Sequence, residues 1–270
     1  MLSSLFLGAM AGIALGLTGA GGGILAIPLL TFGAGLSQTQ AAPIALVAIS
    51  LAAALGAALG LREGVVRYRA ALLIGGAGML VAPAGVWLAH RAPPAALTLG
   101  LAVVMALSAL TMHRRSHGQP AQASAAGHAS PPCYCSAETG RFAWTRTCAA
   151  VLAGIGLVTG ALSGLLGVGG GFVLVPAFTR LSNLPVGAIV STSQAVIALV
   201  SAAGAVAAAS QQHLQWQVAL PFTLAAMAAL AGTRRLARRL SPRLVQTSFA
   251  VLSGGIATVL LVRAAQGGLG

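Results

Sequence analysis

The stretch GLTGAGGG at residues 16–23, followed by Pro28, occurs a second time as GLLGVGGG at residues 164–171, followed by Pro176. Every glycine of the first copy, and the proline, recurs 148 positions later. Three consecutive glycines are unfavourable in a helix, by about 1 kcal/mol each relative to alanine. A segment that only crosses a membrane does not need them. The pattern therefore predicts an interrupted helix in each half of the chain, where backbone groups face a ligand instead of lipid.

The overall composition is that of a membrane protein. Of the 270 residues, 57% are hydrophobic and only 6% are charged, whereas soluble domains carry about a quarter charged residues. Apolar runs of roughly 20 residues, long enough to cross a bilayer as helices, recur along the chain. We therefore predict an all-α, polytopic transmembrane helical bundle. We expect the first residues to open the first membrane segment, because they lack the basic region of a cleaved signal peptide.

The two glycine stretches belong to a longer internal duplication. An ungapped register continues beyond them, and its corresponding pairs include Tyr68 with Trp216, Arg91 with Arg239, and Pro94 with Pro242. This register predicts two homologous transmembrane repeats, residues 1–112 and 147–270. The polar stretch 113–146 between them has no apolar helical face and is predicted to be a flexible linker. If each interrupted segment is counted once, the protein has about eight membrane segments.

The distribution of charge predicts how the repeats are oriented. The net charge is +13, all basic residues are arginine, and the only acidic residues are Glu63 and Glu138. The loop at 62–69 has three arginines, its counterpart at 211–217 has none, and the loop at 234–243 has five. Arginine-rich loops are typically cytoplasmic, so corresponding loops of the two repeats lie on opposite faces and the linker is cytoplasmic. We therefore prefer inverted repeats to a parallel arrangement, which would place the five-arginine loop outside.

Several function classes are disfavoured by the residues that the spans lack. The arginines lie between hydrophobic spans, where they determine topology, so the positive charge does not indicate nucleic-acid binding. Neither glutamate lies in a span, so a proton relay or sodium site of buried carboxylates has no candidates, and the cargo is expected to be an anion. No nucleophile–base–acid set, P-loop or dinucleotide fingerprint is present, so neither an enzyme nor a cofactor is expected. Cys133 and Cys135 are separated by one residue in a Pro-rich context, which favours a solvated linker over a metal site.

The two interruptions are predicted to form the substrate site. Paired breaks in inverted repeats meet near the bilayer midplane, and a helix that restarts there presents free N–H groups and the positive end of its dipole. Hydroxyls and an amide in residues 191–194 supply further donors, although a helix N-cap with its first turn is an equal interpretation of this segment. The candidate substrate-binding residues are Thr18, Gly21, Gly22, Gly23, Ser163, Gly169, Gly170, Gly171, Ser191, Thr192, Ser193 and Gln194.

Helix packing is the alternative role for the glycines. Gly12 with Gly16, and Gly160 with Gly164, have the GxxxG spacing of close helix contacts, so we assign these four to packing. We assign the triple glycines to ligand binding or hinge motion. If every glycine served packing alone, the protein would be an integral membrane binding or assembly protein without transport.

A run of arginines near the end of the second repeat forms one helical face at a predicted membrane edge. Its members are Arg234, Arg235, Arg238 and Arg239. We expect them to extend to anionic lipid headgroups, with substrate steering as the alternative. Tyr68 and Trp216, which begin corresponding spans, are predicted to be interfacial anchors.

The paired motifs resemble those of the TauE/SafE permeases, a family named for sulfite exporters and also called TSUP. The duplicated architecture and the arginine-rich turn before Ser241-Pro242 support this resemblance. It implies a bacterial inner-membrane permease that moves small sulfur-containing or organic anions, such as sulfite or sulfonates, by secondary transport. The family tends to carry a Ser-Thr-Ser-type turn after the glycine motif. Residues 191–193 match that turn, whereas residues 43–45 (Pro-Ile-Ala) depart from it in the first repeat.

Overall fold

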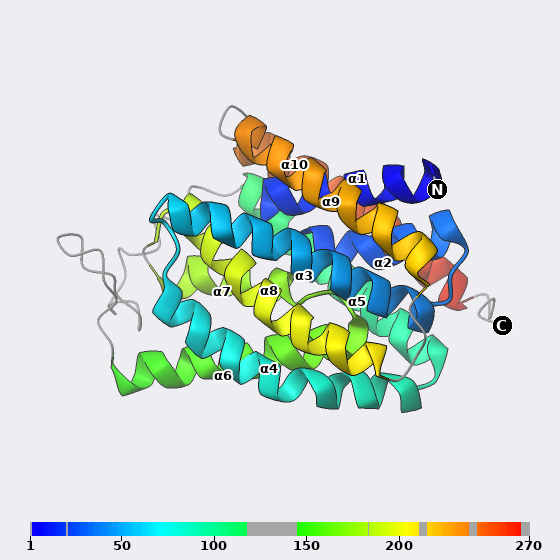
Figure 1. Cartoon of the computed structure of the whole chain (residues 1–270), viewed down its shortest axis with the longest axis horizontal. Helices are drawn as coiled ribbons and strands as arrows, with labels where there is room; N and C mark the ends of the chain where they lie inside the picture. Colours follow the sequence, from blue (N-terminus) through cyan, green and yellow to red (C-terminus); the bar gives the residue numbers. More distant parts are fainter. Residues whose placement is uncertain are drawn as a thin grey trace.

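The computed structural model describes residues 2–19, 21–117, 145–182, 184–210, 215–237 and 242–265, and within these ranges the chain forms ten α-helices (Figure 1). The helices are α1 (Leu2–Thr18), α2 (Gly21–Ala34), α3 (Gln38–Arg62), α4 (Tyr68–Arg91), α5 (Pro94–His117), α6 (Arg146–Leu166), α7 (Gly171–Leu181), α8 (Val186–Ala209), α9 (Trp216–Ala237) and α10 (Pro242–Ala265). Six of the described helices are long and apolar enough to cross a membrane. The prediction of a multi-pass, all-helical protein is therefore confirmed. Helix α5 continues to His117, five residues beyond the predicted end of the first repeat.

Local sequence signals set several helix ends. Helix α3 begins with a capping box, in which the Ser37 hydroxyl accepts from Gln40 N and the Gln40 side chain accepts from Ser37 N. The Thr145 hydroxyl caps α6 by accepting from Cys148 N at 3.1 Å. The same helix ends at Gly167, whose φ of +69° places it in the left-handed region that glycine adopts most readily.

Each half contains the predicted helix interruption. Between α1 and α2, Gly19 has a φ of +70°. Between α6 and α7, Gly167, Gly169 and Gly170 have φ values of +69°, +76° and +67°. Residues with side chains rarely adopt these angles, so the glycines allow the chain to leave the helix and restart it within a few residues.

The short helix after each break does not continue the helix before it. Helix α2 folds back along α1, since Gly22 lies against Ala11 and Leu15, and Gly33 lies against Leu7. Helix α7 has 11 residues, so its length of about 16 Å is well short of a bilayer core. Each interrupted segment is thus a pair of packed helices, which is compatible with the estimate of about eight membrane segments that counts each pair once.

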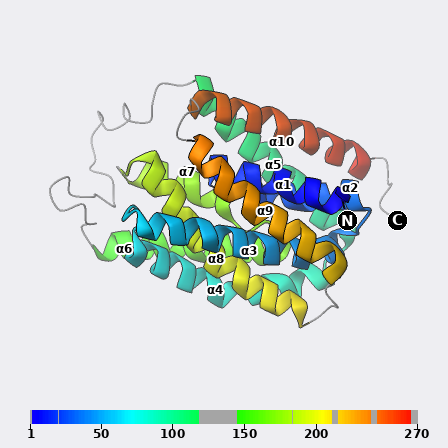
Figure 2. The same ribbon diagram turned by 45° about the horizontal axis from the view of Figure 1, so that its top comes forward.

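Helices that correspond in the two repeats make corresponding packing contacts. Helix α1 packs along α9, and α6 packs along α4, which is the corresponding pair. Helices α3 and α8 pack against each other, as do α5 and α10, and each of these pairs joins counterparts (Figure 2). Two related halves arranged about a common axis would produce this set of contacts.

The counterpart helices α3 and α8 cross in antiparallel directions. Ser50 Oγ donates to the carbonyl oxygen of Ala198, its counterpart in the other repeat, at 3.1 Å. On one side of this crossing Gly60 lies against Ser191, and on the other side Gly204 contacts Leu46. Inverted repeats require this antiparallel crossing. They also require the loop after α3 and the end of α9 to share one end of the bundle, where Glu63 and Arg234 form an ion pair.

The GxxxG glycines lie at tight helix crossings, as assigned from their spacing. A Cβ on Gly12 would overlap the backbone of Ala226 in α9, and a Cβ on Gly160 would overlap the backbone of Gly78 in α4. The two contacts are counterparts in the register of the duplication. The same short approach of two backbones therefore occurs twice, once in each half.

The outer surface of the bundle is rich in apolar side chains. Exposed examples from four different helices are Phe6, Leu80, Leu224 and Val251. This distribution suits a surface that faces lipid acyl chains. Tyr68 and Trp216 are the first residues of α4 and α9, and both are more than half exposed, as interfacial anchors would be.

Candidate functional site

The two breaks lie in direct contact with each other. A Cβ on Gly23, next to the first break, would overlap the carbonyl oxygen of Val168 in the second. Gly167 lies against Ile27 of α2 and Ala42 of α3. The structure thus brings together two glycine segments that are far apart in the sequence.

The glycines of the breaks have a steric reason to be glycine. Gly22 lies against the backbone of α1, and Gly170 lies against Thr159 of α6. Gly169 lies between Ile49 of α3 and the Ser201 hydroxyl of α8, each 3.0 Å from the position of a Cβ. Neighbouring protein atoms therefore fill the space that side chains would occupy. Gly21 and Gly171 are the first residues of α2 and α7. Ligand binding by these glycines stays a prediction.

Buried hydroxyls without partners surround the second break. Thr159 and Ser163 lie one turn apart in α6, and their hydroxyls have no hydrogen-bond partner among the described residues. The same holds for Ser201. Sequence reasoning included Ser163 but missed Thr159 and Ser201. The available signals were that Thr159 is four residues before Ser163, and that Ser201 shares a helical face with Ser191 and Gln194.

The segment 191–194 lies inside a helix and not at its start. Helix α8 begins at Val186 after Pro185, so the N-cap interpretation is wrong. Thr192 Oγ1 accepts from Arg67 N at 3.1 Å, while the buried Ser193 hydroxyl has no partner among the described residues. This segment is therefore an interior polar turn in an otherwise apolar helix.

Gln194 connects this polar turn to the first break. Its Nε2 lies 3.5 Å from the carbonyl oxygen of Leu15, which also accepts from Gly19 N at 2.9 Å. Its buried Oε1 has no partner among the described residues. The Thr18 hydroxyl, in the last turn of α1, donates to Ala14 O at 2.7 Å. Along α8, Ser191, Gln194 and Ser201 thus form a polar stripe that reaches both breaks.

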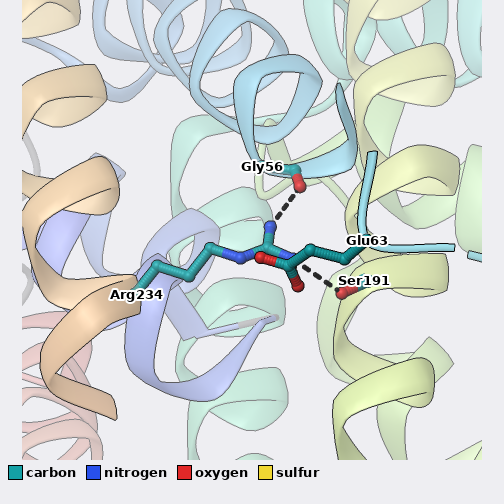
Figure 3. Close-up of polar contacts among 4 residues, drawn as sticks. All are labelled: Gly56, Glu63, Ser191 and Arg234. Carbon is teal, nitrogen blue, oxygen red and sulfur yellow. Dashed lines mark hydrogen bonds and ion pairs between the residues drawn. The ribbon is translucent and has the colours of Figure 1, made fainter. Parts of the chain in front are cut away.

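Arg234 lies at one end of this stripe (Figure 3). Its side chain is only 16% exposed, and its Nη2 donates to Ser191 Oγ at 3.2 Å and to Glu63 Oε2 at 3.1 Å. Its Nη1 donates to the carbonyl oxygen of Gly56 in α3. For this residue the structure differs from the expectation of a lipid contact, because Arg234 is on the face of α9 that packs against α3.

The remaining arginines of that run stay untested. The side chain of Arg235 lies outside the described residues, as do Arg238 and Arg239. The linker with Cys133 and Cys135 also lies outside them. Within the described ranges, no three His, Cys, Asp or Glu side chains are grouped as a metal site would require.

The residues of the first repeat that correspond to Ser191, Gln194 and Arg234 are apolar. These residues, Pro43, Leu46 and Val86, line a small pocket of about 20 Å³ together with the polar Gln38, Thr39 and His90. The corresponding positions thus differ in chemistry: the second repeat has a hydroxyl, an amide and a guanidinium where the first has apolar side chains.

Comparison with known proteins identifies relatives over nearly the whole chain. The family model described as "Sulfite exporter TauE/SafE" matches residues 4–260. A protein named "Probable membrane transporter protein" from Xylella fastidiosa strain Temecula1 is 27% identical over 235 residues, covering 87% of this chain and 84% of the relative. Another of the same name, from strain 9a5c, is 29% identical over 216 residues, covering 80% and 76%. No solved structure matches the chain.

Proposed function

The chain belongs to the sulfite exporter TauE/SafE family, and we propose that it is a secondary transporter that moves a small anion across the bacterial inner membrane by alternating access. The family and the names of the relatives support a multi-pass membrane transporter. The proposed cargo is sulfite, a sulfonate, or a related organosulfur or carboxylate anion. That choice depends on the chemistry of the groups around the breaks.

Unpartnered donors in an apolar interior are the observation that carries the proposal. The hydroxyls of Thr159, Ser163 and Ser201 are buried and lack partners among the described residues. Leaving such a group unsatisfied costs about 1–3 kcal/mol, so their presence beside the breaks calls for a functional reason. A hydroxyl can donate to an oxyanion, and the guanidinium of Arg234 contacts Ser191 at one end of the stripe. These groups favour an anion over a cation.

The breaks are also suited to conformational change. Gly169 lies against Ile49 of α3 and Ser201 of α8, close to the crossing of the two counterpart helices. Glycine changes its backbone angles with little steric cost, so a motion of α3 relative to α8 can be absorbed there. In alternating access, such a motion would open the two related ends of the bundle in turn.

The proposal is tested by anion-dependent stabilisation of the purified protein. We expect one or more of sulfite, sulfate, thiosulfate, sulfoacetate and acetate to raise the melting temperature, with taurine and chloride as comparisons. A ligand at 100 times its Kd stabilises the folded state by about 2.7 kcal/mol. The stabilising anion should also enter liposomes that contain the protein. Absence of both stabilisation and flux for every anion would refute the proposed function.

Removing one unpartnered hydroxyl locates the site. We expect Ser163→Ala to leave the melting temperature unchanged or to raise it, because the variant loses no hydrogen bond among the described residues and removes an unpartnered polar group, but to weaken anion binding at least about tenfold. Ser253→Ala is the matched control, since Ser253 is equally buried but donates to Phe249 O within α10. It should lower stability by about 1 kcal/mol without changing anion affinity. Equal anion affinity in Ser163→Ala and wild type would remove Ser163 from the site.

A further inference from the structure

The guanidinium of Arg234 is held in place by two acceptors that belong to the helical framework. One is the carbonyl oxygen of Gly56, inside α3, and the other is the hydroxyl of Ser191, inside α8. Because both acceptors lie within helices, these contacts orient the fork of the guanidinium. Its Nη2 then points at the place occupied by the Glu63 carboxylate (Figure 3).

Glu63 differs from the other two partners in how it is held. It is the first residue after α3, its side chain is 38% exposed, and Gly64 follows it with a φ of +71°. A carboxylate at the C-terminal end of a helix lies at the negative end of the helix dipole, which is unfavourable. The ion pair with Arg234 offsets this unfavourable position, and the carboxylate is more exposed to solvent than the guanidinium that it contacts.

We propose that Arg234 is a binding residue for the transported anion, and that the Glu63 carboxylate occupies the anion's place until the anion displaces it. The inference rests on the proposed function and adds the residue that recognises the negative charge. The ligand class is a small oxyanion with two acceptor oxygens, as in a carboxylate, a sulfonate or sulfite, because this is the geometry that a guanidinium pairs with. Ser191 Oγ lies 3.2 Å from the same nitrogen that binds Glu63, so its hydroxyl hydrogen can be donated to the incoming oxygen.

The position of Arg234 links this site to the breaks. Gly56, whose carbonyl binds Arg234, also lies against the Gln194 side chain. Gln194 in turn contacts Leu15 O at the first break. Gln194 and, further along α8, Ser201 are therefore the next polar groups of the stripe after Ser191. The counterpart of Arg234 in the first repeat is Val86, so only one of these two corresponding positions carries a positive charge.

A purely structural role makes a different prediction. If the ion pair serves only to hold α3, α8 and α9 together, removing Glu63 lowers stability and leaves anion affinity unchanged. If Glu63 competes with the anion, removing its charge strengthens anion binding. Glu63→Gln keeps the shape of the side chain and removes only the charge, so it separates the two roles.

The experiment measures half-saturating concentrations for sulfite, acetate and methanesulfonate by thermal shift at constant ionic strength, on the full-length protein in detergent. We expect Glu63→Gln to bind anions roughly three- to tenfold more tightly than wild type, the range of a half-exposed, hydrogen-bonded ion pair. Glu138→Gln, which removes the only other acidic charge of the chain, should match wild type. Arg234→Lys should weaken binding at least about tenfold, because lysine lacks the planar fork. Arg62→Gln removes an exposed positive charge nearby and should have no effect.

Each outcome bears on a separate claim. If wild type binds an anion but Glu63→Gln and Arg234→Lys bind it equally well, the assignment of Arg234 is overturned while the proposed function stands. If Arg234→Lys fails to fold, the comparison of Glu63→Gln with Glu138→Gln still decides, since identical half-saturation in the two refutes the competition. If none of these three anions stabilises wild type or Glu63→Gln, the assignment of Arg234 is refuted, and the proposed function is then decided by the wider anion panel and by flux into liposomes.

Discussion

Alanine in place of Gly170 is expected to destabilise the protein by about 2–5 kcal/mol. Two independent costs contribute. The φ of +67° at this position costs an L-residue about 1–2 kcal/mol, and the added Cβ would overlap Thr159, an overpacking that costs about 1–3 kcal/mol. The effect is measured as the loss of melting temperature of the purified protein in detergent.

The control separates these two costs. Gly35 has the same φ of +67°, but no atom lies within 4 Å of the position that a Cβ would occupy there, so Gly35→Ala should lose only the about 1–2 kcal/mol of the backbone cost. Equal losses in the two variants would contradict the contact between Gly170 and Thr159. Leucine at Gly170 would disturb folding before any effect on anion binding could be measured. Replacing nearby hydroxyl residues by alanine, as in Ser163→Ala, is therefore the better test of anion binding.

Alanine in place of Gly160 is expected to destabilise the crossing of α6 with α4 by about 1–3 kcal/mol. The new Cβ would overlap the backbone of Gly78, so the helices would have to separate and lose the contacts around that point. Gly160 lies inside a regular helix, and its cost is therefore steric. The midpoint of unfolding in detergent measures it.

Gly154 supplies the matched control within the same helix. A Cβ at this position meets nothing within 4 Å, and alanine is a better helix former than glycine by about 1 kcal/mol. Gly154→Ala should therefore leave stability unchanged or raise it slightly. If Gly160→Ala were as stable as Gly154→Ala, the tight crossing would not exist, and the packing role of the GxxxG pairs would have to be abandoned.

The two halves of the bundle make corresponding helix contacts but have different side chains at some corresponding positions. Gly12 and Gly160 repeat one contact, and Ser50 with Ala198 joins counterpart positions at the centre. The side chains near the ends differ, because Val86 occupies the place that corresponds to Arg234. Under the proposed function, the two halves would move relative to each other and Arg234 would recognise the cargo.

Much of the architecture could be predicted from the sequence, because it depends on local properties. Apolar runs of sufficient length predicted the long helices, and the glycine motifs predicted breaks at residues 19–23 and 167–171. The second break lies as predicted, whereas the first lies just before Gly21–Gly23, which form the start of α2. The ungapped offset of 148 residues between the repeats predicted which positions correspond, and the Ser50–Ala198 hydrogen bond joins one such pair.

Other features were decided only by tertiary structure. Helical spacing placed Arg234 on a face of its helix but could not say which neighbour that face meets, so a lipid contact was expected where Gly56, Ser191 and Glu63 are bound. The folding of α2 back along α1 depends on the fit of Gly22 and Gly33 against another helix. Local pattern determines which segments are helical and where they break, because hydrogen bonding and backbone sterics act over a few residues. Which buried polar groups meet is determined by packing between distant segments, and this sets where an anion can be bound.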